Sequence, residues 1–467
     1  MRRRTIAVVA LLLLAPKAHA RNICDILKQK GVLNDIEYNE CIAEQEKDEV
    51  KTQKTAQDVV ASKWPKWLDM LTPFGDLRIR QEGFYEQGLI ANNRFRLRAR
   101  VGLNVTPSDE VGATFRLTSG NPNDPISTNQ TFTGAFTRKP FNLDWAYLTI
   151  KPSHTIGLDP GWFTILAGKF GEPNYRVSEL VWDDDLSPEG FNETVNFLDQ
   201  KEGMLRGLSL NLSQWTVDQV STGGDPVMLG GQLVANTAFG GTATWTAAFA
   251  DYYYNHLNEV ASNLLSPTSK NFNSALQNSN AVIVNLNTGG ILAYATGFNI
   301  LNWSTELNFA NPVGLGIPGG AFADVVYNTR ADGRNTGFYM GFGFGKAGRD
   351  WYHDNLRNPG DWGFSYTNAW VEQNSTLSIF TYSDVSYIQQ KISQTGGTNM
   401  IANILRFDYM PFTNFQLTAK VHFINALDRA IAVGTPLTSG SAAPFSLTSL
   451  TGNPTLVRTQ FDAVLRF

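Results

Sequence analysis

The chain has 467 residues, of which 42% are hydrophobic, 12% are aromatic and only 17% are charged. This composition excludes disorder as the general state and is sufficient for a large core or for two to three ordinary domains. A formal net charge of −4 and an isoelectric point near 5.8 argue against a nucleic-acid binder. The mean hydropathy of −0.20 is too polar for a helical membrane protein, although the charged fraction is low for a soluble protein.

Residues 1–20 have the three parts of an export signal. Arginines at positions 2–4 precede an apolar run from Ile6 to Ala15, and small residues at 18–20 predict cleavage after Ala20. A buried helix or a membrane anchor is the alternative, but this run of ten residues is shorter than the roughly 20 that span a bilayer. Cleavage would leave 34 Lys and Arg against 42 Asp and Glu, a charge of about −8, on a chain that works outside the cytoplasm.

Residues 21–60 are expected to form a periplasmic helical hairpin or linker, because their apolar residues recur at helical spacing on either side of Gly31. Both cysteines of the chain, Cys24 and Cys41, lie in this segment. An exported chain with two cysteines usually oxidises them, so a disulfide is predicted, with two buried thiols as the alternative.

From Gly75 to Phe467 the apolar residues fall on every second position, which is the period of a β-strand. In residues 94–105 four arginines share one face, while Phe95, Val101 and other apolar residues share the opposite face. A helix would scatter these arginines around its circumference. After a turn at 106–109, the same alternation continues from Val111.

The length of the alternating runs favours strands that cross a membrane. Several runs last 9 to 12 residues, whereas strands of a soluble sandwich, the alternative, are usually about 5 or 6 long. Aromatic residues near the strand ends suit a lipid–water boundary. Short turns on one rim and long loops on the other are typical of bacterial outer-membrane barrels. The predicted short turns are 106–109 and 411–414, and the predicted long connections are 119–141, 171–200, 255–280, 349–361 and 426–454.

The last strand ends on an aromatic residue, Phe467, which resembles the assembly signal of Gram-negative outer-membrane barrels. The sequence predicts an all-β membrane protein, an antiparallel transmembrane barrel of about 16 strands. Dividing residues 76–467 by 16 strands gives roughly 24 residues for each strand with its connection, which fits a barrel of this size. Fourteen or eighteen strands are possible, because residues 281–320 are ambiguous.

Three segments carry a family resemblance: GDLRIRQE at 75–82, LAGKFG at 166–171 and LVWDDDLSPEG at 180–190. They resemble, in this order, the signatures of the putative-porin family of proteobacteria. The resemblance implies a passive channel in the cell outer membrane, with outer-membrane lipid, lipopolysaccharide and the barrel assembly machinery as partners. By analogy with better-known porins it also implies a homotrimer.

The candidate site residues are charged side chains that are expected to face the lumen. An arginine facing lipid would cost about 2 to 4 kcal/mol at the midplane, so the arginines of the first strands are assigned to the inner wall. We call this set the arginine ladder: Arg78, Arg80, Arg94, Arg96, Arg98, Arg100 and Arg116.

Five acidic residues in the connection 171–200 could lie opposite the arginine ladder and constrict the lumen if that loop folds inward. They are Glu179, Asp183, Asp184, Asp185 and Glu189. In the alternative, they lie in a solvated outer loop, where they could hold Ca²⁺.

Other motifs give no catalytic site. Two glycine patterns, at 314–319 and 343–348, match a dinucleotide fingerprint but begin no helix, and the five histidines lack metal spacing. We therefore predict a water-filled porin for small hydrophilic solutes or ions, without catalysis, cofactor, metal or nucleic acid. An anion-selective or substrate-specific channel that uses the arginine ladder is one alternative, and a barrel-embedded enzyme or adhesin is another.

Overall fold

The computed structural model describes residues 28, 30, 38, 65–86, 90–221, 223–346, 356–385, 396–428 and 455–467. The predicted export signal, Cys24, Cys41 and most of residues 21–60 lie outside these residues, so the cleavage site and the disulfide stay predictions. The chain divides into two units, residues 1–72 and 73–467. In the first unit, a short 3₁₀-helix, η1 (Lys66–Met70), begins after Pro65.

No helix within the described ranges combines the length and the apolar character needed to cross a membrane.

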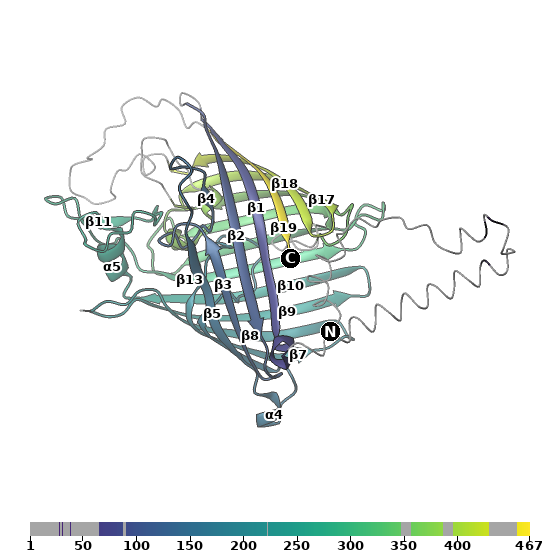
Figure 1. Ribbon diagram of the computed structural model, residues 1–467. Coiled ribbons are helices and arrows are strands. Elements are labelled where there is room, and N and C mark those ends of the chain that lie inside the picture. Colours follow the sequence, from purple (N-terminus) through teal and green to yellow (C-terminus); the bar gives the residue numbers. More distant parts are fainter. Residues whose placement is uncertain are drawn as a thin grey trace. The chain divides into compact units, whose positions relative to one another are not determined.

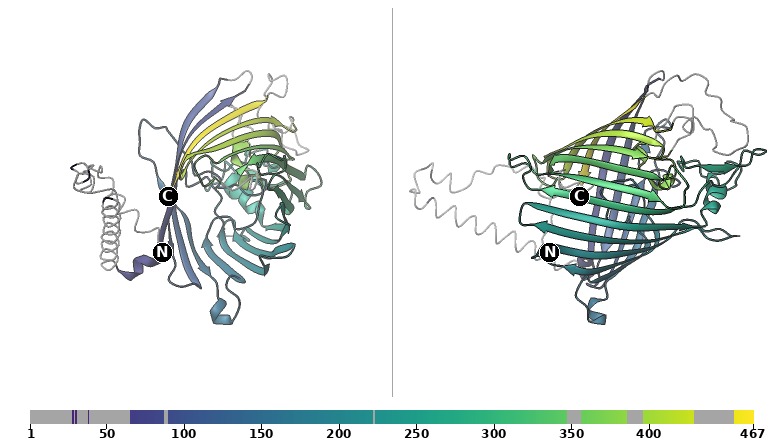
Figure 2. Two further views of the ribbon diagram at one scale, coloured as in Figure 1. Left: turned by 90° about the vertical axis from the view of Figure 1, so that its right-hand side faces the viewer. Right: turned by 180° about the vertical axis from the view of Figure 1, so that it is seen from behind.

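The second unit is a closed antiparallel β-barrel (Figures 1 and 2). Its sheet has seventeen strands, and without the two-residue β4 (Gln130–Thr131) sixteen strands form the wall. The sheet closes because β1 pairs with both β2 and β19. The prediction of a barrel with about 16 strands is therefore confirmed. The wall consists of β1 (Leu71–Tyr85), β2 (Asn92–Val105), β3 (Val111–Ser119), β5 (Phe141–Ile150), β6 (Phe163–Lys169), β7 (Glu189–Asp199), β8 (Leu205–Thr216), β9 (Val227–Phe239), β10 (Ala243–Asn255), β13 (Asn299–Phe309), β14 (Gly319–Asn328), β15 (Thr336–Gly345), β16 (Trp362–Val371), β17 (Met400–Phe412), β18 (Phe415–Ala426) and β19 (Leu456–Arg466).

The first strands of the barrel have an apolar outer face and a polar inner face. On β2 the outer side chain of Phe95 is 55% exposed, whereas the inner Arg98 is buried. On β3 Phe115 is half exposed, and its neighbour Arg116 is buried. An exposed apolar band outside and buried charges inside are the pattern of a barrel in lipid with a polar lumen. In Figure 1, β1 to β5 run steeply across the strands of the opposite wall, as tilted barrel strands do.

The connections differ in length at the two ends of the barrel. Residues 106–110, 240–242 and 413–414 form short turns at one end. The other end carries the longer connections 120–140, 170–188, 256–298 and 372–399. In the connection 256–298 lie α5 (Leu257–Val260), the π-helix η2 (Ala261–Leu265) and a separate hairpin of β11 (Val282–Val284) and β12 (Ile291–Tyr294). A four-residue helix, α4 (Ser153–Ile156), lies between β5 and β6 at the end with the short turns (Figure 1).

Two predicted connections are wrong in extent or position. The connection predicted at 171–200 ends at Pro188, because residues 189–199 form β7. A register shift between Asn196 and Leu198 interrupts the alternation of β7, which hides this strand in the sequence. The connection predicted at 349–361 joins β15 to β16 and so lies at the end with the short turns.

The barrel seam joins the first and last strands. Gly75 and Phe467 exchange two backbone hydrogen bonds of 3.0 Å, and β1 begins at Leu71, before the predicted start at residue 75. A Cβ atom on Gly75 would lie 2.6 Å from the ring of Phe467, so only glycine leaves room for the terminal aromatic ring. The segment that carries the family resemblance therefore starts at Gly75, the residue that leaves room for the ring of Phe467.

Candidate functional site

The connection between β6 and β7, residues 170–188, folds into the lumen, and we call it the inner loop. Its base is closed by a 3.0 Å hydrogen bond from the Phe170 amide to the Pro188 carbonyl. Gly168 and Gly190 flank the base as partners in the sheet, with φ angles of +129° and +142°. Other residues rarely adopt these angles, so the two glycines let the chain leave the wall at this point.

Aromatic packing holds the inner loop against one wall. The buried ring of Trp182 meets Trp215 of β8 with ring centroids 5.0 Å apart, and Tyr252 of β10 with centroids 5.2 Å apart. Both pairs are edge-to-face, the favoured arrangement of aromatic rings. Phe170 is fully buried and contacts Trp215 in the same way. This part of the lumen is therefore filled by an apolar cluster.

Polar contacts fix the inner loop to the same wall. Gln232 of β9 accepts a hydrogen bond from the Tyr175 amide at 2.8 Å and donates one to the Tyr175 carbonyl at 2.7 Å. The Ser178 hydroxyl donates to Asp324 of β14 at 2.6 Å. The backbone groups of Tyr175 and the hydroxyl of Ser178 are thus satisfied by the wall that they cover.

The first described part of the connection between β16 and β17, residues 372–385, also enters the lumen, and we call it the second loop. Its backbone is joined to the inner loop, because the Tyr382 amide donates to the Glu179 carbonyl at 3.1 Å. The Asp183 amide donates to the Phe380 carbonyl at 2.7 Å, and the Asp183 carboxylate accepts from the Ser383 amide at 2.9 Å. The two loops therefore form one connected structure across the lumen.

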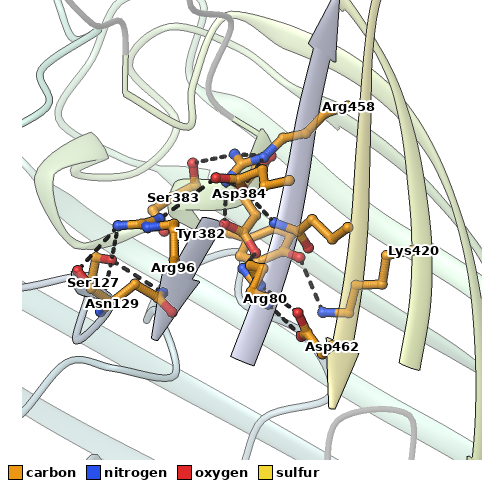
Figure 3. A network of polar contacts seen from close by, with 12 residues as sticks. Arg80, Arg96, Ser127, Asn129, Tyr382, Ser383, Asp384, Lys420, Arg458 and Asp462 are labelled. Atoms are coloured by element: carbon orange, nitrogen blue, oxygen red, sulfur yellow. Dashed lines mark hydrogen bonds and ion pairs between the residues drawn. The ribbon is translucent and has the colours of Figure 1, made fainter. Parts of the chain in front are cut away.

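Carboxylates pair with most of the arginine ladder. Arg80 binds Asp462 at 2.7 and 2.8 Å and Asp384 at 3.1 Å. Figure 3 shows these contacts, which join β1, β19 and the second loop. The other pairs are Arg94 with Glu82 at 2.5 Å, Arg98 with Asp76 at 3.0 Å, Arg100 with Asp76 at 2.6 Å and Arg116 with Asp144 at 2.6 Å. Most of the positive charge of the ladder is thus offset locally.

Three basic side chains have weaker or no compensation. Arg96 lies 3.8 Å from Glu82 and donates to Ser127 and to the Asn129 carbonyl at 3.3 Å. Arg78 donates to Asn129 Oδ1 at 2.6 Å, and its buried Nε has no hydrogen-bond partner. Lys420 of β18 donates to the Tyr382 hydroxyl at 3.4 Å. Within the described residues, no carboxylate forms an ion pair with Arg78 or Lys420.

The five predicted acidic residues do not form one cluster opposite the arginine ladder, but have different positions and partners. Asp185 lies 3.7 Å from both Arg98 and Arg100 and accepts from the Thr128 amide at 3.1 Å. Asp183 joins the second loop, and Asp184 is exposed and lies 3.6 Å from Arg176. Glu189 begins β7, where its exposed carboxylate pairs with Lys169 at 2.8 Å, so it does not belong to the constriction.

The pKa values of the loop acids diverge with their surroundings. Burial inside the lumen raises the pKa of Glu179 to about 8, and the neighbouring charge of Asp184 adds to this effect. Burial likewise raises the pKa of Asp183, with a further contribution from Glu179. Burial alone would raise the pKa of Asp185 as well, but the guanidinium groups of Arg98 and Arg100 hold it well below its usual range.

Two adjoining cavities lie between the inner loop and the basic wall. Their volumes are about 150 and 60 Å³. Arg78, Lys420 and Glu179 line both of them. The arrangement therefore offers charged and hydrogen-bonding groups to a solute inside these cavities.

Several site residues are absent from the sequence prediction. Arg458 of β19 binds Glu82 and also donates to Asp384 at 2.6 Å, and Lys420 contacts Tyr382 (Figure 3). The alternation of β19 could have predicted that Arg458 faces the lumen, because Arg458 and Asp462 share the face of this strand opposite to Phe461. Asp384 and Tyr382 lie in an irregular segment and had no such signal.

Metal-ligating side chains form no cluster in the described part of the chain. No group of three or more His, Cys, Asp or Glu side chains there could hold a metal ion. His422 is buried, and its Nε2 lies 3.2 Å from the Tyr382 hydroxyl, as part of the lumenal packing.

Comparison with known families agrees with this geometry. A family model described as Putative porin matches residues 86–410. The chain belongs to the Putative porin family. This porin is therefore assigned to the bacterial outer membrane as a channel-forming barrel.

Several solved structures are similar to this porin. OprB of Pseudomonas putida, at high pH, has 10% sequence identity and a TM-score of 0.48, and the match covers 86% of this chain and 96% of OprB. OmpF of Salmonella typhi, in a complex with daunomycin, has 11% identity and a TM-score of 0.43 over 85% and 97% of the two chains. The anion-selective porin of Comamonas acidovorans has 10% identity and a TM-score of 0.42 over 85% and 99%. No curated protein matches the sequence significantly.

Proposed function

We propose that this porin forms a water-filled channel through which small hydrophilic solutes diffuse passively, with a preference for anions. The observation that carries the proposal is the cavity of about 150 Å³ between the inner loop and the basic wall of a closed barrel. Its lining includes charged side chains from both sides of the lumen. Charged side chains and inward-folded loops are the usual selectivity devices of pores.

The preference for anions rests on fewer residues than the whole arginine ladder. Arg80, Arg98 and Arg116 have carboxylate partners at 2.6 to 3.0 Å, so their fields are largely offset nearby. Arg78 and Lys420 lack such partners among the described residues and line both cavities. We therefore assign the preference mainly to these two side chains.

Conductance of the purified porin in planar bilayers tests the proposal. Ohmic currents that rise with salt concentration are expected, and a protein that inserts folded but stays silent would overturn the channel function. In a salt gradient, the reversal potential should have the sign of an anion-selective pore. The double variant Arg78→Gln/Lys420→Gln should move it toward zero, whereas the control Lys201→Gln, at an exposed residue outside both cavities, should leave it unchanged.

We also propose that this porin is a homotrimer and that it contacts lipopolysaccharide and the barrel assembly machinery. Residues 1–20 act as its export signal and Phe467 as its assembly signal. Crosslinking in native membranes would measure the oligomeric state directly.

A further inference from the structure

Arg78 and Lys420 differ from the other basic residues of the constriction. They reach the cavities from β1 and β18, and among the described residues no carboxylate pairs with either. The Nε atom of Arg78 is buried and has no hydrogen-bond partner in the protein. Buried donors are normally satisfied, so this N–H group points to a missing acceptor.

The larger cavity also has an apolar part, which is unusual for a porin lumen because the interior of such barrels is generally polar. Val177 of the inner loop, Phe322 of β14, Ile404 of β17 and Val464 of β19 are all buried and line it. Charge filtering alone does not require these side chains. They provide a surface for the apolar body of a solute.

The volume and the charged lining of the cavity limit which solutes can bind in it. Its volume of about 150 Å³ resembles that of an engineered protein cavity that binds benzene, which corresponds to one ring or a short aliphatic chain. Guanidinium groups bind carboxylates with particularly good geometry. The carboxylate of Asp184 lines the same cavity and would repel a second negative charge.

We propose that the larger cavity is a binding subsite for small monocarboxylates with an apolar body, in which Arg78 and Lys420 bind the carboxylate group. Val177, Phe322 and Ile404 contact the apolar body. The subsite rests on the proposed channel function, since the solute reaches it through the lumen.

Block of single-channel current by benzoate in planar bilayers tests this subsite. Benzoate should interrupt the current of the wild-type porin in a concentration-dependent manner. Benzamide, which has the ring without the charge, and acetate, which has the charge without the ring, should require at least about tenfold higher concentrations, because each lacks one of the two contacts. Phthalate, a dianion, should also be weaker than benzoate.

Variants assign the block to the named residues. Arg78→Gln and Lys420→Gln should each raise the half-blocking benzoate concentration at least about tenfold, because a hydrogen bond to a charged group is lost. Ile404→Ala should weaken the block by benzoate and leave that by acetate unchanged. Lys201→Gln removes an exposed positive charge outside both cavities and should have no effect.

The two proposals fail in different ways. A wild-type protein without conductance would overturn the channel function. Normal conductance with equal effects of benzoate and benzamide, or with no block by either, would overturn the subsite and leave the channel intact. This comparison uses only the wild-type protein, so it decides the question even if a variant does not fold.

Discussion

Arg80 on the first strand of the barrel and Asp462 on the last face each other across the seam, and two hydrogen bonds of 2.7 and 2.8 Å join them. Both residues are buried, and Arg80 also binds Asp384 of the second loop at 3.1 Å. One side chain therefore connects closure of the barrel with the position of a loop in its lumen.

Asp462→Asn should weaken the seam. Removing one partner of a buried ion pair typically costs about 3 to 5 kcal/mol, and the remaining contact of Arg80 with Asp384 places the expected cost near the lower end. The temperature at which the folded band disappears in semi-native gel electrophoresis measures the effect. Glu189→Gln is the matched control, because it breaks an exposed pair that contributes about 0 to 1 kcal/mol. Equal melting of the two variants would contradict this role of the seam pair.

Ion selectivity should depend on pH through Glu179. Burial raises the pKa of its carboxyl group from 4.5 to about 8, with a further contribution from Asp184, while Lys420 and Arg176 oppose the shift and Asp384 adds to it. The group is therefore mostly neutral at pH 7 and becomes negative above about pH 8. Since a new negative charge at the constriction favours cations, the preference for anions should decrease between about pH 7 and pH 9.

Reversal potentials measured across this pH range check the prediction. Glu179→Gln keeps the side chain neutral and should remove the pH dependence, whereas Glu189→Gln, on the exposed end of β7, should retain it. A transition that persists in the Glu179→Gln variant would assign the titration to another group.

Trp182→Ala should release the inner loop from the wall. The ring is buried and contacts both Trp215 and Tyr252, and truncation of a buried tryptophan costs about 3 to 5 kcal/mol. The barrel strands do not depend on this ring for their backbone pairing, so the cost should fall on the loop. Single-channel recordings should show a larger and noisier conductance than the wild type. Trp303→Ala, on the outer face of β13, is the control and should leave the conductance unchanged.

The barrel could be predicted from the sequence because the alternation of outer and inner side chains is visible within each single strand. In residues 94–105 every second side chain must suit lipid and the others must suit a polar lumen, so the alternation alone indicates strand, inner face and membrane. The inward direction of Arg98 and Arg116 follows from the same rule. β7 was missed because a register shift interrupts its alternation.

The partners of the arginines could not be predicted in this way. Arg80 binds Asp462, 382 residues away, and Asp384, 304 residues away. Alternation gives the face of each side chain, but the strand register and the path of the second loop decide which charges meet. For the same reason, the sequence could not separate the compensated Arg98 from Arg78, which has no ion pair within the described residues.

Gly190→Ala should disturb the base of the inner loop. Gly190 has a φ angle of +142°, and a Cβ atom there would lie 2.2 Å from the Gln214 carbonyl oxygen of β8. Alanine at such a position destabilises a protein by more than about 1 kcal/mol, and the strain lies where the loop leaves the wall. We expect a lower melting temperature of the folded band together with altered conductance. Gly241→Ala is the matched control, because a Cβ atom at that turn would meet nothing within 4 Å. If both variants melted and conducted alike, the positive φ angle of Gly190 would have no part in positioning the inner loop.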